Sequence, residues 1–290
     1  MSIGIAVELV LNGVLIGGIY SLMAIGLSLI LGVSRVLNIA HGEFIMLGGL
    51  TATLIFSAAG LNPFLLVFLI PLLFIPVGFF FESVFIKPLL ARPHHTLLIS
   101  SILVTFGLAL IFEDTVGFVW GAYAKGIPYP LPSVVFGGLT IPSIRLIALT
   151  IVVGVTIFLW FFLKNTYVGL ASRAIMMDRE GAVLSGVNIS WISMVTFGIG
   201  AALASMAGVF HSILLSVEPY MGLPLTLICL SIIVVGGVGS MLGTLIAGLL
   251  IGISEVTITY TFGLQWAPTV PIIILIAILM IRPRGLFGRE

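Results

Sequence analysis

The chain alternates between long apolar stretches and short polar connections, and this pattern predicts most of its architecture. A helix that crosses a bilayer needs about 20 mainly apolar residues. Stretches that approach or exceed this length lie near 6–33, 39–59, 63–86, 96–119, 145–163, 191–215, 223–238, 241–260 and 268–281. The runs are continuously apolar rather than alternating every second residue, which favours helices over the strands of a barrel. We therefore expect an all-α transmembrane bundle of about eight or nine membrane segments, forming a single domain over residues 1–290.

Glycines indicate where these helices break or pack closely. The run near 223–238 is short for a full span, so we expect discontinuous or re-entrant segments among the crossings. Val36–Ile55 and Val234–Ile251 share a weak internal similarity, since each follows an apolar helix and is interrupted by glycines. Small residues also recur four apart, at Gly13/Gly17, Gly200/Ala204/Gly208 and Gly239/Gly243/Ala247. This spacing predicts faces where two helix backbones approach each other.

Composition excludes the ordinary soluble classes of protein. Hydrophobic residues make up 60% of the chain and charged residues 7%, whereas soluble domains carry about 25% charged residues. No basic residue precedes the first run, which is too long for a cleavable signal peptide, so we expect it to remain as a helix. The single cysteine, Cys229, lies in an apolar run, which excludes an intramolecular disulfide and a thiolate metal cluster. A net charge of +1 gives no general attraction to nucleic acid, and we expect no cofactor.

The basic residues predict the orientation of the bundle, because lysine and arginine are retained on the cytoplasmic side. If the chain begins outside and crosses at each run, the basic residues inside are Arg35, Lys87, Arg92, Lys164, Arg173, Arg179, Arg282, Arg284 and Arg289. Lys125 and Arg145 then lie outside. Acidic residues at or near the outer face are Glu8, Glu113, Asp114, Glu218 and Glu255. We therefore expect the N-terminus outside and the C-terminus in the cytoplasm.

One long polar segment, Lys164–Trp191, separates two of the apolar runs. Four of its charged residues, Arg173, Asp178, Arg179 and Glu180, are interspersed with small residues. A short helix of this composition suits close docking against another protein. A plain cytoplasmic loop is the alternative.

The densest polar chemistry inside an apolar region is the segment Asn38-Ile39-Ala40-His41-Gly42-Glu43. Ionisable groups at membrane depth are costly and face a bundle interior or a water-filled cavity. Gly42 allows the backbone to bend, and the amides of a helix that resumes there favour an anion nearby. Glu43 either caps that helix or pairs with His41 or Arg35. The segment thus either braces a broken helix or contacts substrate.

The remaining polar features do not assemble an active site. Glu8, Asn12, Glu82 and His211 are isolated within apolar runs, where interfacial or helix-bonding roles are expected. The loop Trp120–Ser143 is rich in Pro, Gly and aromatic residues and either caps the bundle or meets a partner outside. His94-His95 predicts a solvated turn rather than a metal site. No nucleophile elbow or nucleotide-binding pattern occurs in the sequence, so transport is favoured over catalysis.

Four segments carry a family pattern: LNGVLIGGIYSLMAIGLSLILGV, VLNIAHGEFIMLGG, TYVGLASRAIMMDREGAVLSGVNI and RPRGLFG. In them the chain resembles the permeases of bacterial branched-chain amino-acid ABC importers, specifically the shorter, LivH-type subunit. The second and third segments are the most specific, and their matching positions are Asn38, His41, Gly42, Glu43, Gly169, Arg173, Ala174, Asp178, Ala182 and Gly186. Ile39 stands where the pattern usually has Phe, a mild departure.

The resemblance implies partners for this subunit in the bacterial inner membrane. These are a second homologous permease, two cytoplasmic ATPase subunits and a periplasmic or extracellular solute-binding protein. ATP hydrolysis would belong to the ATPases, and residues 164–190 would form a coupling segment that binds them. The candidate coupling residues are Gly169, Arg173, Ala174, Asp178, Arg179, Ala182 and Gly186. Asn38, His41, Gly42 and Glu43 would lie near the translocation path or brace the broken helix beside it.

The substrates implied by the resemblance are leucine, isoleucine and valine, moved by alternating access. The same permease type also resembles subunits for urea, short amides and other amino acids. A secondary transporter, which works without ATPases, is a further alternative. It would need a coupling-ion site at mid-membrane, and the scarcity of buried acidic pairs in the sequence argues against it.

Overall fold

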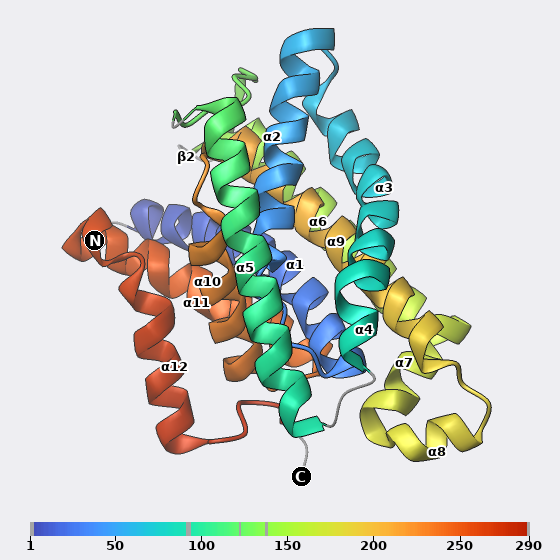
Figure 1. Ribbon diagram of the computed structural model, residues 1–290. Helices are drawn as coiled ribbons and strands as arrows, with labels where there is room; N and C mark the ends of the chain where they lie inside the picture. Colours follow the sequence, from blue (N-terminus) through green and yellow to red (C-terminus); the bar gives the residue numbers. More distant parts are fainter. Residues whose placement is uncertain (1–2, 91–93, 122, 137–138, 289–290) are drawn as a thin grey trace.

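The computed structural model describes residues 3–90, 94–121, 123–136 and 139–288, which form one bundle of tilted helices (Figure 1). Its elements are α1 (Ile3–Ser34), α2 (His41–Ala59), α3 (Pro63–Phe81), η1 (Glu82–Ile86), α4 (Lys87–Leu90), α5 (His94–Trp120), β1 (Ser133–Phe136), β2 (Leu139–Pro142), α6 (Ser143–Asn165), α7 (Tyr167–Met177), α8 (Arg179–Leu184), α9 (Ile189–Leu214), α10 (Gly222–Gly236), α11 (Met241–Phe262), η2 (Leu264–Trp266) and α12 (Thr269–Ile281).

The number of membrane segments agrees with the sequence pattern. Among the described residues, 7 helices are long and apolar enough to cross a membrane, and α10 and α12 are shorter apolar helices. The prediction of an all-helical bundle with about eight or nine segments, some of them incomplete, is therefore confirmed. The π-helical turn η1 joins α3 to α4, so these three elements form one continuous span from Pro63 to Leu90.

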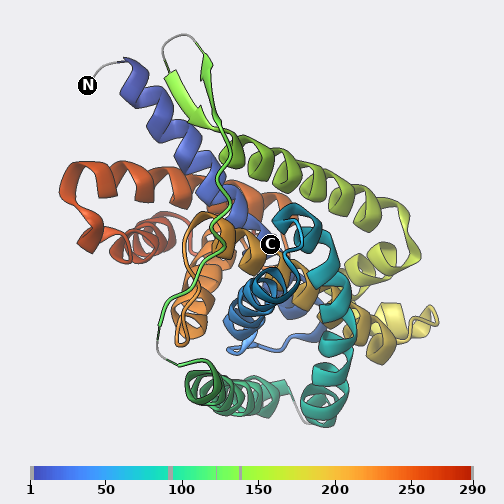
Figure 2. The same cartoon turned by 90° about the horizontal axis from the view of Figure 1, so that it is seen from above.

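Helices α1 and α9 form the centre of the bundle and are its most buried spans. They pack on each other, α11 packs on α1, and α2 and α3 pack on α9. At 32 residues α1 exceeds the length of a perpendicular crossing, which agrees with its oblique path in Figure 1. Seen from above (Figure 2), α5 and α6 lie on opposite sides of the bundle.

Glycines permit the close approach of the central helices. A Cβ at Gly17 would lie 2.7 Å from Leu249 Cα of α11, and a Cβ at Gly208 would collide with the Ile45 carbonyl of α2. The spacing at Gly13/Gly17 and Gly200/Ala204/Gly208 thus predicts real packing faces. Gly239 is different, because it precedes α11 and has a φ of +78°. The prediction that Gly239 shares a helical face with Gly243 is therefore wrong, because Gly239 lies outside the helix and its positive φ is incompatible with a right-handed helix.

The outer surface is apolar, as contact with lipid requires. Helices α5 and α6 expose large side chains such as Leu103 and Phe158, which are 67% and 68% accessible. Cys229 is buried and unpaired.

The predicted loop Trp120–Ser143 contains a hairpin that its sequence did not predict. Strands β1 and β2 pair antiparallel, with Ser133 opposite Pro142. Ahead of the hairpin, Lys125 and Val217 exchange backbone hydrogen bonds, which pin the loop to the connection between α9 and α10. The loop therefore covers one end of the bundle.

Most elements that carry or adjoin basic residues lie toward the other end of the bundle. Helices α4, α7 and α8 lie there with Lys87, Arg173 and Arg179, and so do the ends of α1 and α12, which directly precede Arg35 and Arg282 (Figure 1). This arrangement agrees with the charge pattern of the sequence. Arg92 and Arg289 lie outside the described residues. His94 and His95 open α5 rather than forming a turn, and their side chains are not described.

Candidate functional site

The connection between α1 and α2 breaks the helical path inside the bundle. Helix α1 ends at Ser34, and Arg35 adopts a φ of +54°, which helices do not tolerate. Residues 35–40 then run without regular structure to His41, where α2 begins. A backbone without internal hydrogen bonds is tolerated at membrane depth where the protein buries it and satisfies its polar groups.

Two threonines from other helices form hydrogen bonds with the backbone of this connection. Thr105 of α5 accepts a hydrogen bond from the Ile39 amide at 3.0 Å. Thr226 of α10 donates to the Ile39 carbonyl at 2.9 Å and accepts from the Gly42 amide at 2.8 Å. The break is thus fixed from two sides, by α5 and α10. We call residues 35–43, with Thr105 and the first turn of α10, the junction.

His41 and Asn38 lie fully buried within the junction. The His41 Nε2 atom lies 3.0 Å from the Met23 carbonyl of α1, which ties the start of α2 to the preceding helix. Among the described residues, neither polar side-chain atom of Asn38 has a hydrogen-bond partner. Buried polar groups without partners are rare and frequently mark functional positions.

Glu43 lies at the contact between α2 and α10. Its carboxyl group packs against Gly222, where a Cβ would collide with the Glu43 Oε1 atom. Both carboxyl oxygens are buried without a hydrogen-bond partner in the described part of the chain. The predicted pairing with His41 or Arg35, and the predicted capping of α2, are therefore wrong: the backbone places this carboxyl group against α10 instead.

Glu113 of α5 also belongs to this group, although its sequence context does not indicate it. Its Oε1 atom accepts a hydrogen bond from the Leu223 amide, in the first turn of α10, at 3.4 Å. Two carboxyl groups from different helices thus meet one helix N-terminus, where exposed amides favour negative charge. Their separation of 70 residues along the chain left no local signal.

The polar segment 164–190 folds into two short helices, α7 and α8, at the basic end of the bundle (Figure 1). The side chain of Thr166 caps α7 by accepting from the Gly169 amide, and that of Asp178 caps α8 by accepting from the Glu180 amide. Asn188 caps α9 in the same way. Short polar residues at helix starts satisfy amides that otherwise have no partner, so the sequence determines where each helix begins.

Three small residues of this segment pack against their own chain. Ala171 and Ala182 are 2% and 4% exposed and form an apolar cluster with Val33 and Ile192. A Cβ at Gly169 would collide with the Leu163 backbone. The segment is therefore seated on the last turn of α1, directly before the junction.

The two arginines differ in their surroundings. Arg173 is exposed and donates to the Lys164 carbonyl at 3.1 Å. Arg179 is half-buried and donates to the Val33 carbonyl, at the end of α1, at 3.3 Å. Burial lowers the pKa of the Arg179 guanidinium, and the neighbouring charge of Arg35 lowers this pKa further. Arg179 faces the chain itself, whereas Arg173 faces outward.

The outward surface of α7 and α8 is more apolar than the polar sequence of this segment predicts. Met177, Val183 and Leu184 are 74%, 53% and 89% exposed. Asp178 is also exposed, and the exposed Gly186 has a φ of +82°. An apolar patch with a polar rim is typical of a protein interaction surface. We call these three apolar residues, with Arg173 and Asp178, the outward face.

Comparisons with known proteins agree with this architecture. The family model described as "Branched-chain amino acid transport system / permease component" matches residues 9–279. The permease protein BraD of a high-affinity branched-chain amino acid transport system, from Pseudomonas aeruginosa, is 31% identical over 296 residues, covering 96% of this chain and 94% of BraD. The corresponding LivH of Escherichia coli is 29% identical over 301 residues, covering 96% of this chain and 94% of LivH.

A solved structure supports the fold. PsaBC from Streptococcus pneumoniae in complex with Fab is similar with a TM-score of 0.50, at 12% sequence identity, over 94% of this chain and 91% of that one. At this identity the similarity concerns the fold alone. The family match along nearly the whole chain carries the assignment: this protein belongs to the permease components of branched-chain amino-acid ABC transport systems.

Proposed function

We propose that the protein translocates leucine, isoleucine and valine across a bacterial inner membrane, as the membrane subunit of an ATP-driven importer. The family match and the named relatives support the substrate class. In this proposal a second permease completes the pore, two ATPase subunits bind at one end, and a solute-binding protein delivers substrate at the other. The N-terminus would lie outside and the C-terminus in the cytoplasm, which follows from the gathering of basic residues at one end.

The contact between α8 and α1 carries the mechanistic part of the proposal. The ATPases would bind the outward face, with Arg173 and Asp178 as polar contacts. Ala174 and Gly186 would allow close approach, whereas Gly169 and Ala182 would act by seating the two helices on the chain. A displacement of α8 would act on the end of α1 through Arg179 and the Val33 carbonyl. The junction follows within two residues of that carbonyl.

The junction would respond to this displacement as the moving part of the translocation path. Asn38, His41, Gly42 and Glu43 lie where α1, α2 and α10 meet. In this conformation protein atoms fill the space, because α2 and α10 touch at Gly42 and Gly222. Separation of these two helices would expose polar groups to a passing substrate, and their contact would close the path.

Two alternatives make different predictions. The same subunit type could carry urea, short amides or other amino acids, and selection would then rest with the solute-binding protein. A secondary transporter would move substrate without ATPase partners. The outward face of α7 and α8 favours the ATP-driven importer, because a transporter that acts alone has no use for an exposed apolar patch at this end.

Uptake of radiolabelled amino acids into proteoliposomes tests the proposal. We expect uptake of leucine, isoleucine and valine to require the ATPase subunits, the binding protein and ATP together. Urea and acetamide serve as competitors in parallel samples. Full uptake by the permease pair without ATP would overturn the ATP-driven mechanism, and competition by urea rather than valine would overturn the substrate assignment.

A further inference from the structure

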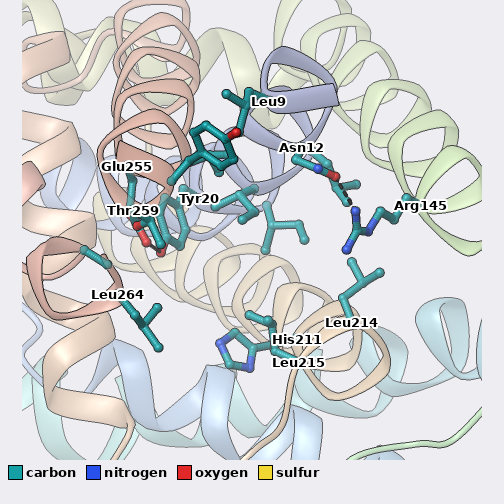
Figure 3. Close-up of a pocket in the computed structure, with 16 residues that line it drawn as sticks. Leu9, Asn12, Tyr20, Arg145, His211, Leu214, Leu215, Glu255, Thr259 and Leu264 are labelled. Atoms are coloured by element: carbon teal, nitrogen blue, oxygen red, sulfur yellow. Dashed lines mark hydrogen bonds between the residues drawn. The ribbon is translucent and has the colours of Figure 1, made fainter. Parts of the chain in front are cut away.

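A cavity of about 480 Å³ lies between α1, α6, α9 and α11, away from the junction and from α7 and α8 (Figure 3). Its volume lies within the range of sites for small molecules, about 300–1,000 Å³. Its position follows from the topology: Arg145 is near the start of α6, which leads to α7, and His211 is near the end of α9, which follows α8. The cavity therefore belongs to the end of the bundle opposite the outward face.

Opposite charges line two sides of this cavity. Arg145 lies on one side, where its Nη1 atom donates to Asn12 Oδ1 at 2.6 Å. Glu255 lies on the other side, where its Oε1 atom accepts from the Tyr20 hydroxyl at 3.1 Å. Figure 3 shows these two pairs across the cavity from each other, with His211 below them, near Leu214 and Leu215.

Two polar atoms in this group lack a partner in the described part of the chain. The Glu255 Oε2 atom and the His211 Nδ1 atom are both buried without a hydrogen bond. A buried carboxyl oxygen without a partner is costly, and a ligand that donates a hydrogen bond removes that cost. The wall between the polar groups is apolar and includes Leu15, Ile16 and Leu214.

We infer that this cavity binds a free zwitterionic amino acid with an apolar side chain. The carboxylate of the ligand would pair with the Arg145 guanidinium, which suits a planar anion. The ammonium group would donate to Glu255 Oε2, and the side chain would contact the leucine and isoleucine wall. Each ligand charge thus meets its opposite, which offsets the cost of removing both from water.

The inference rests on the proposed function, since it assigns the site that a branched-chain amino acid enters first after release from the binding protein. It also concerns residues that the sequence pattern left unconnected. Asn12, Tyr20, Arg145, His211 and Glu255 come from four helices. The sequence predicted isolated interfacial or helix-bonding roles for Asn12 and His211, and a place at the outer face for Arg145 and Glu255.

Equilibrium binding of tritiated leucine to the assembly of permeases and ATPases tests the site. The assembly is placed in phosphatidylglycerol nanodiscs, without binding protein or nucleotide. We expect saturable binding that weakens at least about tenfold in Glu255→Gln and in Arg145→Gln, because each leaves one ligand charge unpaired. The exposed carboxyl group of Glu218, at the same end of the bundle, provides the control Glu218→Gln, which we expect to bind as the unmodified protein does.

Two leucine analogues separate the charges of the ligand. 3-Methylbutylamine lacks the carboxylate and 4-methylpentanoate lacks the ammonium group. We expect both to compete at least about tenfold less well than leucine. Arg145→Lys keeps the positive charge and should retain more affinity than Arg145→Gln, which distinguishes ligand pairing from a loss of folding.

Unchanged leucine affinity in both Glu255→Gln and Arg145→Gln would overturn the inference. Phosphatidylethanolamine also carries an ammonium and an anionic group, and its displacement of leucine when added to the nanodiscs would assign the cavity to lipid. ATP-driven leucine uptake by an assembly that shows no such binding would refute the cavity site alone, whereas loss of uptake in the unmodified assembly would refute the proposed function.

Discussion

The junction and the segment of α7 and α8 are two regions where polar residues interrupt the apolar chain, and they differ in which side chains face inward. At the junction every helix turns its polar groups inward, and threonines from α5 and α10 satisfy the broken backbone. At α7 and α8 the small residues turn inward, while Arg173 and large apolar side chains turn outward. The difference indicates that the polar segment inside the bundle serves internal contacts, whereas the segment outside it leaves apolar side chains exposed, as the proposed binding of a partner requires.

The two regions are also joined. Val33 belongs to the apolar cluster under α7 and α8, and its carbonyl accepts the hydrogen bond of Arg179. Two residues later the junction begins at Arg35. The contrast therefore predicts that changes at the junction damage the fold, whereas changes at the outward face damage partner binding and leave the fold intact.

The largest effect is expected for Gly42→Val. A Cβ at this position would collide with the Gly222 carbonyl, which belongs to backbone and cannot move aside. We expect a loss of about 3 kcal/mol or more in stability, measured as lost yield of monodisperse protein in detergent. Gly154→Val is the control, because a Cβ there meets nothing within 4 Å. Equal yields for both variants would contradict the close contact of α2 and α10.

Thr226→Val should have the next largest effect on the fold. It keeps the side-chain shape but removes the hydrogen bonds to Ile39 and Gly42. Unsatisfied buried backbone groups cost about 1–3 kcal/mol each, so thermal unfolding in detergent should occur at a clearly lower temperature. Thr257→Val, which loses a bond within its own helix at an exposed position, is the control. An unchanged unfolding temperature for Thr226→Val would show that the threonine does not hold the break.

Arg173→Glu tests whether the outward face binds the ATPase subunits. Charge reversal on an exposed contact should weaken ATPase binding by about tenfold, the range of interface arginines, and leave thermal unfolding unchanged. Co-purification of the ATPase subunits measures this. Arg282→Glu, an exposed reversal outside the segment, is the control. Normal ATPase binding and normal uptake in Arg173→Glu would argue strongly against a coupling role.

Leu184→Ser should have a smaller effect of the same kind. This side chain is 89% exposed, so the permease itself loses no packing. Burial of a leucine against a partner is worth about 1.5–3 kcal/mol, and its partial loss should weaken ATPase binding by about fivefold. Ala182→Ser provides the contrast, since that position is buried on the inner face of α8 and should affect the unfolding temperature first. The reverse pattern would mean that α8 faces the bundle differently.

The sequence predicted the general architecture well because its signals are local. Runs of apolar residues defined the helices, whereas the helix starts capped by Thr166, Asp178 and Asn188 are findings of the structure. The segments around Asn38–Glu43 and Lys164–Trp191 were recognised as special by composition. Gly239 was assigned to the wrong structure because four-residue spacing cannot distinguish a helix from the turn before it.

The arrangement of the sites could not be predicted, because it depends on contacts between distant residues. Glu113 reaches the start of α10 from α5, and Arg145 and Glu255 share a cavity although 110 residues separate them. The sequence also did not indicate which residues of α7 and α8 face outward and which face the bundle. Arg173 and Arg179 look alike in the sequence, but one faces outward and the other binds the end of α1.

The number of leucine molecules imported per ATP hydrolysed, in proteoliposomes containing Arg179→Ala, tests the coupling through α8 most directly. Arg179 lies beside the outward face rather than on it, so ATPase binding and hydrolysis should persist. Loss of its bond to Val33 should lower uptake by about fivefold, within the range of residues that carry coupling between sites. A fall in leucine imported per ATP is therefore the expected result. An unchanged ratio, with uptake and hydrolysis either both normal or both reduced in proportion, would contradict the account.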